Sequence, residues 1–340
     1  MQRENAGLGD TSPQAPVTVG HAGRHSRADS DIVILIPCYN EALTIADVVR
    51  DFRLALPDAA VHVYDNNSTD DTARIAGEAG AIVGRVRRQG KGSVVQRMFA
   101  EVDASVYLMV DGDGTYDAAS AARLIDRLVV EELDMVVGVR RTADAEAYRA
   151  GHQWGNRALT RCVNALFGQG LTDVLSGYRA FSRRFVKSFP ALAQGFEIET
   201  ELTVHALSLR MPVGEVTTPY GTRPKGSSSK LRTYRDGWRI LITILMLFEK
   251  ERPLVFFSIL AGTFSGIALI LAVPLLVTYL ETGLVPRIPT AILSTGLMLL
   301  ASLCVVCGLV MDAVTLARRE AKRLAYLAIA PFQSRGTAGD

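Results

Sequence analysis

The residues best suited to chemistry are two aspartates that follow an apolar run, in the segment Val110-Asp111-Gly112-Asp113-Gly114-Thr115. Two carboxylates one residue apart repel each other unless a cation lies beside them. Mg²⁺ and Mn²⁺ prefer oxygen ligands, and Mg²⁺ is often held by one or two carboxylates together with substrate phosphates. The pattern predicts that Asp111 and Asp113 bind Mg²⁺ or Mn²⁺ and a diphosphate.

The same segment admits other interpretations. Asp-x-Asp-Gly-Thr also resembles the nucleophile motif of haloacid-dehalogenase-type phosphatases, in which Asp111 would attack phosphate and Asp113 would act as acid and base. Such enzymes need a further acidic pair after a later strand, but Glu131 and Glu132 end a predicted helix. In these phosphatases the motif also normally follows the first strand of the fold, whereas three predicted strand–helix units precede it in this sequence. A third interpretation is a plain turn whose aspartates cap the next helix.

The elements around this segment predict an α/β fold. Short apolar, β-branched runs alternate with stretches of helical spacing, which is typical of a doubly wound, mostly parallel sheet. In such sheets the ligand lies beyond the carboxyl ends of the strands. Four polar or glycine-rich loops fall at those ends: Pro37–Glu41, Asp65–Asp70, Gly90–Gly92 and Asp111–Thr115. Expected strands are 31–36, 61–64, 81–86, 106–110, 135–139 and 213–219, and expected helices are 41–56, 69–79, 91–103, 118–131, 147–167 and 197–209.

These four loops, in this order, resemble the donor-binding motifs of glycosyltransferase family 2, which has the GT-A fold. The motifs are Ile36-Pro37-Cys38-Tyr39-Asn40-Glu41, Asp65-Asn66-Asn67-Ser68-Thr69-Asp70, Gly90-Lys91-Gly92 and the paired aspartates. Further along, Ser176-Gly177-Tyr178-Arg179, Glu199-x-Glu201 and Gly226–Leu231 resemble the dolichyl- and polyprenyl-phosphate sugar synthase branch. Glu199 and Glu201 could also be solvated helix residues.

The resemblance implies a role for each matching position. Asp111 and Asp113 would hold the metal and the diphosphate, and together with Arg179 they are the candidate catalytic residues. The acceptor phosphate would be bound by Arg179, Arg223 and Lys230. The candidate donor-site residues, including those that border the base and ribose, are Pro37, Tyr39, Glu41, Asp65, Asn67, Lys91, Asp111 and Gly112.

Two departures from the branch pattern affect this site. Thr115 stands where the branch often has Gln, so one metal contact would be weakened or replaced by water. The second loop reads Asp-Asn-Asn rather than the commoner Asp-Asp-Gly, which would alter the preference for the base.

The last hundred residues predict a membrane hairpin. Leu254–Leu280 and Ile288–Met311 are 27 and 24 residues without a charge, and each is longer than the roughly 30 Å hydrocarbon core of a bilayer. Lys and Arg cluster before the first span and after the second, which predicts a cytoplasmic catalytic domain and cytoplasmic termini in the cell membrane. Trp238–Phe248 is too short to span and predicts an amphipathic helix at the membrane surface.

The expected organisation therefore has five parts: 1–30 disordered tail, 31–233 GT-A domain, 234–252 interfacial amphipathic helix, 253–317 transmembrane hairpin (254–280 and 288–311) and 318–340 cytoplasmic C-terminal tail. The net charge of +2 does not point to nucleic acid. The four cysteines do not indicate a disulfide framework. A homo-oligomer is possible, because hairpin spans often associate.

The predicted function is metal-dependent, inverting transfer of a sugar from a nucleotide-sugar to a polyprenyl phosphate at the cytoplasmic membrane face, for cell-envelope glycans or protein glycosylation. A processive polysaccharide synthase is the nearest alternative, although its Gln-x-x-Arg-Trp motif is absent from the sequence. An inactive scaffold is an alternative of another class, and it would not need both aspartates.

Overall fold

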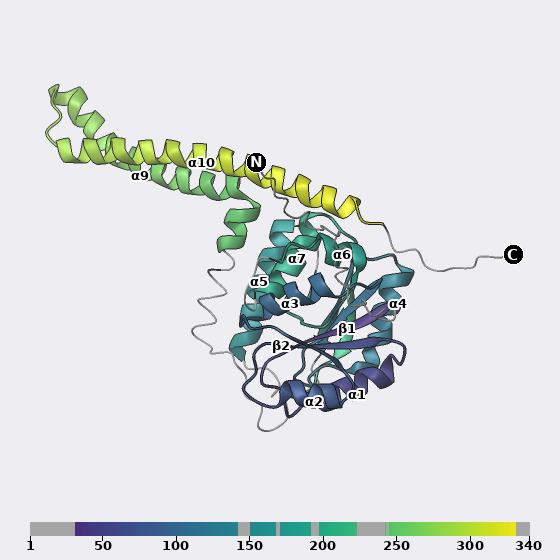
Figure 1. The fold of residues 1–340 in the computed structure, drawn as a ribbon. Coiled ribbons are helices and arrows are strands. Elements are labelled where there is room, and N and C mark those ends of the chain that lie inside the picture. The colour runs from purple at the N-terminus through teal and green to yellow at the C-terminus, as the bar shows by residue number, and fades with distance from the viewer. Residues whose placement is uncertain are drawn as a thin grey trace, which may run out of the picture.

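A computed structural model describes residues 31–141, 150–167, 171–191, 197–222, 242 and 245–330. Its centre is one sheet in the order β3-β2-β1-β4-β6-β5-β7 (Figure 1). Neighbouring strands run parallel except β6, which is antiparallel to both β4 and β5. The strands are β1 Ile32–Cys38, β2 Ala60–Asp65, β3 Ile82–Arg85, β4 Val106–Met109, β5 Met135–Arg141, β6 Arg179–Ser182 and β7 Val213–Pro219.

Helices cover both faces of the sheet. On one face, the apolar stripes of α1 and α4 pack against alternate residues of β1 and β4. On the other face, α3, α6 and α7 bury a second cluster. Residues of a strand alternate between these clusters, as the period of two requires. The helices of this domain are α1 Ile45–Ala55, α2 Thr72–Glu78, α3 Lys91–Glu101, α4 Ala121–Val130 (after the short helix Ala118–Ser120), α5 Ala150–Phe167, α6 Arg183–Ser188 and α7 Ile198–Ser208.

The predicted doubly wound, mostly parallel sheet is confirmed, with two elements that the sequence pattern did not predict. β6 and α6 follow each other directly over Arg179–Ser188. β6 has only four residues and opens with an arginine, so no apolar run marks it, although all four residues are buried. Its antiparallel direction brings the residues before it, rather than those after it, to the carboxyl edge of β4.

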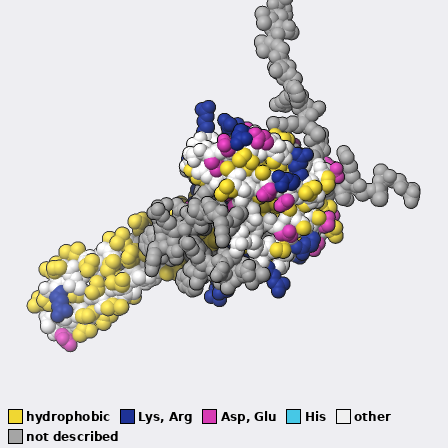
Figure 2. All heavy atoms as spheres, turned by 90° about the horizontal axis from the view of Figure 1, so that it is seen from below, with side chains coloured by type: hydrophobic (Ala, Val, Ile, Leu, Met, Phe, Trp, Pro, Cys, Tyr) yellow, Lys and Arg dark blue, Asp and Glu magenta, His cyan; other side chains and the backbone are white. Residues whose placement is uncertain are grey.

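Two long apolar helices extend from this domain. α9 (Pro253–Thr282) and α10 (Ile288–Leu327) are both long and apolar enough to cross a membrane. Gly283 ends α9 in a left-handed conformation with φ 68°. The two helices pack along each other, and Ser294 Oγ of α10 donates to the Ala268 carbonyl of α9 at 2.9 Å. Hydrophobic side chains cover the protruding arm in Figure 2, so we treat the pair as candidate membrane spans.

The small residues of the pair contribute unequally to its packing. A Cβ on Gly308 would lie 3.0 Å from Phe257 Cβ, so this glycine lets α10 approach α9 closely. Gly262 and Gly266 have no heavy atom within 4 Å of the corresponding position, leaving out the helix's own backbone. Within the part of the chain that the structure describes, these two glycines therefore do not pack the hairpin together.

The expected C-terminal tail is partly helical instead. α10 continues sixteen residues past Met311 to Leu327, because the charges that end the apolar span do not break a helix. Tyr326 near its end is buried against the α/β domain. The predicted tail 1–30, residues 331–340 of the predicted tail 318–340, and most of the predicted helix 234–252 lie outside the described residues. Within the described part of 234–252, residues 245–251 are helical.

His205 on α7 should make stability depend on pH. It is buried beside Ser188, Phe185 and Phe189. Burial, together with the charge of Lys322 on α10, lowers the pKa of His205 to about 3. An unfolded histidine takes up a proton near pH 6.5. The folded state therefore binds fewer protons below that pH, and this contribution to stability is full above about pH 6.5 and falls toward pH 3.

From pH 7 to pH 5, we expect the free energy of unfolding to fall by about 2 kcal/mol more in the wild type than in His205→Gln. Urea unfolding of the detergent-solubilised protein at both pH values would measure this difference. Equal falls in the two proteins would contradict the assignment.

Candidate active site

The loops that follow β1 and β2 are bound to each other at the carboxyl edge of the sheet. Asn40 has a left-handed backbone with φ 54°. The backbone nitrogen of Asn40 donates to Ser68 Oγ at 2.9 Å, and its side-chain oxygen accepts from the backbone nitrogen of Thr69 at 2.8 Å. The backbone nitrogen of Glu41 donates to Thr72 Oγ1 at 2.9 Å. The two loops therefore form one rigid unit.

Asn66 joins this unit to the third loop. Its side-chain nitrogen donates to the Arg88 carbonyl at 2.8 Å, and its oxygen accepts from the Gly90 nitrogen at 2.7 Å. Gly90 has φ 124°, a conformation that other residues rarely adopt, and α3 begins at the next residue. Asn40 and Asn66 were not singled out as functional residues. Their residue type could have indicated this role, because Asn tolerates the left-handed conformation and its side chain forms hydrogen bonds with nearby backbone groups.

Lys91, Asp111 and Glu199 form the central cluster. The Lys91 ammonium is ion-paired with the Asp111 carboxylate and lies 2.6 Å from Glu199 Oε1. Burial alone would lower the pKa of Lys91, but the two carboxylates outweigh it and raise the pKa well above its usual range. Lys91 is therefore a permanent positive charge between the loop after β4 and the start of α7.

Glu199 is buried rather than solvated. Only 5% of its surface is exposed, and its Oε2 has no hydrogen-bond partner among the described residues. Its position on the first turn of α7 brings it to the same edge as Asp111, although the two are far apart in the sequence. Asp65 is likewise buried, and its Oδ1 also lacks a hydrogen-bond partner within that part of the chain.

Gly177 lies directly against Asp111. A Cβ at this glycine would be 2.4 Å from Asp111 Oδ2, so no side chain fits there without a shift. The nitrogen of Gly177 donates to the Tyr116 hydroxyl at 3.0 Å. The segment before β6 therefore forms one wall of the acidic site.

Asp113 and Thr115 are bound to each other. Asp113 is buried, and its Oδ1 accepts from the Thr115 nitrogen at 3.2 Å and from Thr115 Oγ1 at 2.5 Å. Thr115 thus uses its hydroxyl to hold Asp113 in the turn. Of the two aspartates, Asp111 is the more accessible.

Arg179 is placed differently from the prediction that it binds the acceptor phosphate. Its side chain is fully buried, and its guanidinium donates to the carbonyls of Ser176 and Val174 and to Thr203 Oγ1. Burial lowers the pKa of Arg179 to about 10, against the opposing charges of Glu199 and Asp173. In this structure it supports the segment behind Gly177 and has no surface for a ligand.

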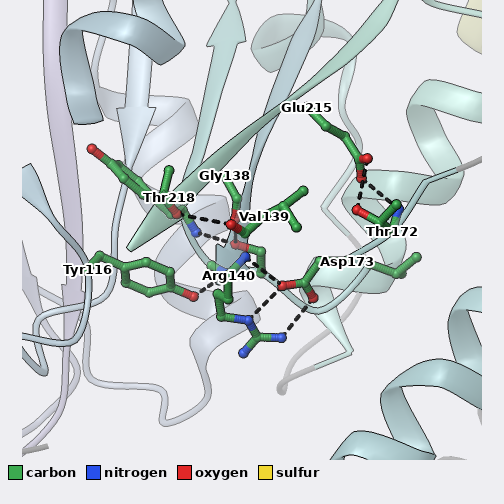
Figure 3. Close-up of polar contacts among 12 residues, drawn as sticks. Tyr116, Gly138, Val139, Arg140, Thr172, Asp173, Glu215 and Thr218 are labelled. Atoms are coloured by element: carbon green, nitrogen blue, oxygen red, sulfur yellow. Dashed lines mark hydrogen bonds and ion pairs between the residues drawn. The ribbon is translucent and has the colours of Figure 1, made fainter. Parts of the chain in front are cut away.

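A second pair of contacts fixes the same segment from outside (Figure 3). Arg140 Nε donates to Asp173 Oδ2 at 2.7 Å, and Arg140 Nη2 donates to Asp173 Oδ1 at 2.8 Å. Glu215 of β7 accepts from the nitrogen and the hydroxyl of Thr172 at 2.7 and 2.9 Å. Residues 171–178 are therefore bound to β5 and β7, and the sequence interpretation missed all four of these residues.

The remaining predicted residues are distributed along the same edge. Pro37 and Gly112 are buried, with Pro37 inside β1 and Gly112 against Cys38. The side chains of Tyr39 and Glu41 are half-buried, and Asn67 is exposed with φ 61°. The predicted acceptor residues Arg223 and Lys230 lie outside the described residues, as does the motif Gly226–Leu231.

The donor atoms suit a hard divalent cation held jointly with a substrate. Among the described residues no group of three His, Cys, Asp or Glu could hold a metal by itself. The predicted ligands Asp111 and Asp113 nevertheless follow β4 at one edge of the sheet, and Glu199, whose Oε2 has no hydrogen-bond partner among the described residues, supplies a further carboxylate oxygen there. Mg²⁺ and its analogues are commonly bound by one or two carboxylates plus phosphate oxygens. The site therefore fits Mg²⁺ or Mn²⁺ arriving with a diphosphate.

A mostly parallel sheet of this order, with paired aspartates after its central strand, is GT-A-like and defines a glycosyltransferase domain. The model of glycosyl transferase family 2 matches residues 33–189. Glycosyltransferase AglJ of Haloferax volcanii is 38% identical over 247 residues, 71% of this chain and 80% of that protein. The chain therefore belongs to glycosyltransferase family 2, which excludes the phosphatase interpretation of the paired aspartates.

Two further comparisons agree with this assignment. The dolichyl-phosphate hexose transferase of Haloferax volcanii is 28% identical over 222 residues, 65% of this chain and 96% of that protein. Among solved structures, glucosyl-3-phosphoglycerate synthase from Mycobacterium tuberculosis, in complex with Mn²⁺ and UDP-glucose, is similar with a TM-score of 0.51. It is 23% identical and the match covers 64% of this chain and 79% of that one, so it supports the fold alone.

Proposed function

We propose that the chain transfers a sugar from a nucleotide-sugar to the phosphate of a polyprenyl lipid, with inversion at the anomeric carbon. The observation that carries this proposal is the Lys91–Asp111–Glu199 cluster at the edge where the donor loops meet. The same chain carries two candidate membrane spans, which suits an acceptor that resides in a bilayer. Similarity to the dolichyl-phosphate hexose transferase supports the acceptor class.

The chemistry follows from the charges. A phosphate monoester has a second pKa near 6, so the acceptor oxygen is already largely ionised at pH 7 and no strong general base is required. Asp111 and Asp113 would hold Mg²⁺ or Mn²⁺, which would stabilise the negative charge of the leaving nucleoside diphosphate. Lys91 supplies a second positive charge at the same edge. Asp65, with its unpartnered buried oxygen, is the proposed ligand of the base.

The acceptor side is proposed from the sequence. Arg223 and Lys230 would bind the lipid phosphate and offset its repulsion by the donor diphosphate. The positions of Lys and Arg around the two spans favour a cytoplasmic catalytic domain in the cell membrane. With Arg179 buried, its proposed role changes from contact with the acceptor to positioning of the segment that holds Gly177.

A double-label assay tests the proposal. Membranes that contain the protein are incubated with polyprenyl phosphate and a panel of UDP-, GDP- and dTDP-sugars carrying ³H in the sugar and ³²P in the β-phosphate. We expect one donor to place ³H but not ³²P in the lipid phase, dependent on divalent metal and lost in Asp113→Ala. Transfer of both labels would indicate sugar-phosphate transfer, and transfer of neither with any donor would contradict the proposal.

A further inference from the structure

The last turn of α10 makes a specific contact with the catalytic domain. Two guanidinium groups lie over the ring of Tyr326, with the central carbon of Arg184 4.7 Å and that of Arg323 5.2 Å from the ring centroid. Its hydroxyl donates to Asp134 Oδ2 at 2.7 Å. Only 7% of Tyr326 is exposed. Two cation–π contacts and a hydrogen bond to a carboxylate make this contact specific.

The contact joins the end of α10 to residues at or next to four elements of the domain, β5, β6, α6 and α7. Asp134, which immediately precedes β5, also accepts from Ser182 Oγ at the end of β6 at 2.6 Å. Arg323 donates to the carbonyl of Leu209 after α7 at 2.8 Å, and Arg184 of α6 donates to the Ile329 carbonyl at 3.0 Å. The start of β5 and the end of β6 lie at the edge of the sheet opposite to Asp111. The helix end is therefore fixed to the edge farthest from the candidate active site.

The other end of the exposed part of α10 is also fixed. Arg319 donates to the carbonyl and the carboxylate of Glu251 at 2.7 and 3.0 Å. Thr315 Oγ1 donates to the Lys250 carbonyl at 3.3 Å. These contacts join α10 to the residues that lead into α9, where the apolar spans begin. The segment from Asp312 to Tyr326 therefore connects the candidate membrane surface to the catalytic domain.

The lengths of two elements match. Asp312 to Tyr326 is about 21 Å of helix at 1.5 Å per residue. β5 begins beside the docked tyrosine and runs about 20 Å to the opposite edge at 3.3 Å per residue. α10 runs from the spans to the far edge of the domain, and β5 runs from that edge toward the site. Figure 1 shows α10 continuing from the hairpin across the domain.

We propose that docking of Tyr326 positions the catalytic domain so that the edge bearing Asp111 lies near the level at which α10 leaves the bilayer. At that level the phosphate of a membrane lipid is within reach, whereas its prenyl chain stays in the hydrocarbon. The last turn of α10 is thus a positioning element for an acceptor embedded in the membrane. This inference rests on the proposed function, because it assumes a lipid-linked acceptor.

The experiment uses the full-length protein in liposomes with two acceptors. One is a long-chain polyprenyl phosphate embedded in the bilayer, and the other is a short prenyl phosphate that is soluble in water. In Tyr326→Ala, we expect turnover of the long-chain acceptor to fall at least tenfold and turnover of the soluble acceptor to stay within twofold. Hydrogen exchange at Asp134 and Met135 should quicken, which reports release of the helix end independently of activity.

A second variant removes no side chain. Seven residues inserted after Glu320 keep the docking face in register and lengthen the connection by about 10 Å. We expect the same selective loss with the long-chain acceptor. Provided that the wild type is active, the inference would be overturned if the variants lost turnover equally with both acceptors, or lost it with neither. If the wild type used neither acceptor, the proposed function itself would be wrong and the inference would fall with it.

Discussion

Replacement of Asp111 by asparagine is expected to lower kcat/KM for the nucleotide-sugar by about 100- to 1,000-fold, the usual cost of one electrostatic group at a reacting centre. Asparagine keeps the shape of the side chain but removes the charge that would hold the metal and the diphosphate. Lys91 retains Glu199 as a partner in this variant. Initial rates of transfer from the donor selected by the labelled panel would measure the effect.

Binding of the metal should change in parallel. Because the described residues offer too few carboxylates to hold a cation by themselves, we expect Mn²⁺ to bind tightly only when a nucleoside diphosphate is present. Electron paramagnetic resonance would detect this, and Asp111→Asn should weaken it. Asp47→Asn is the control, since Asp47 is exposed and, among the described residues, forms a surface ion pair with Arg50 in the next turn of α1. An Asp111→Asn protein that lost transfer activity but retained its full function in the cell would favour the inactive-scaffold alternative.

Replacement of Gly177 by alanine is expected to lower kcat by about 100-fold, because displacement of a catalytic group by about 1 Å has that effect. The new methyl group would lie 2.4 Å from Asp111 Oδ2 and 2.9 Å from its carboxylate carbon. The φ of Gly177 lies outside the left-handed region, so alanine can adopt the backbone conformation and the effect is steric. We expect a stability loss of about 1–3 kcal/mol.

The matched control for this variant is Gly77→Ala in α2. Its new methyl group would lie 3.7 Å from Val83 Cγ2, an ordinary contact. Alanine in a helix should raise stability by up to about 1 kcal/mol and leave turnover unchanged. Comparison of kcat with the melting temperature separates displacement of Asp111 from a general loss of stability. If Gly177→Ala lost stability but kept its kcat, the catalytic position of Asp111 would not depend on the segment that holds Gly177.

The donor half of the fold and site was predictable because its signals are local. Each strand of this half is an apolar run, and the loops of interest follow those runs directly. The amino-acid pattern alone therefore places Asp111 at the carboxyl edge of a strand. The prediction of two candidate spans needed only length and the absence of charge.

The missed features depend on contacts between distant residues. Nothing near Lys91 shows that Glu199 is its partner, because α7 lies more than a hundred residues later. Arg179 was predicted to bind phosphate from the resemblance of its motif to the family branch, yet its partners are two carbonyl groups and Thr203. The sequence predicted a span over 288–311 and a tail over 318–340, and it did not predict that the helix continues to Leu327, because charge limits a membrane span and not a helix.

The reversed direction of β6 has a consequence for how such a domain can diversify. β5 ends at the edge that carries Asp111, and β6 starts there, so residues 142–178 leave and return at the same edge. The entropic cost of closing a connection between two fixed ends grows only slowly with its length. Insertions or deletions in it need not shift the β1–β4 scaffold that carries the donor loops. Proteins with this fold can therefore differ in the length of this connection and keep the same donor loops.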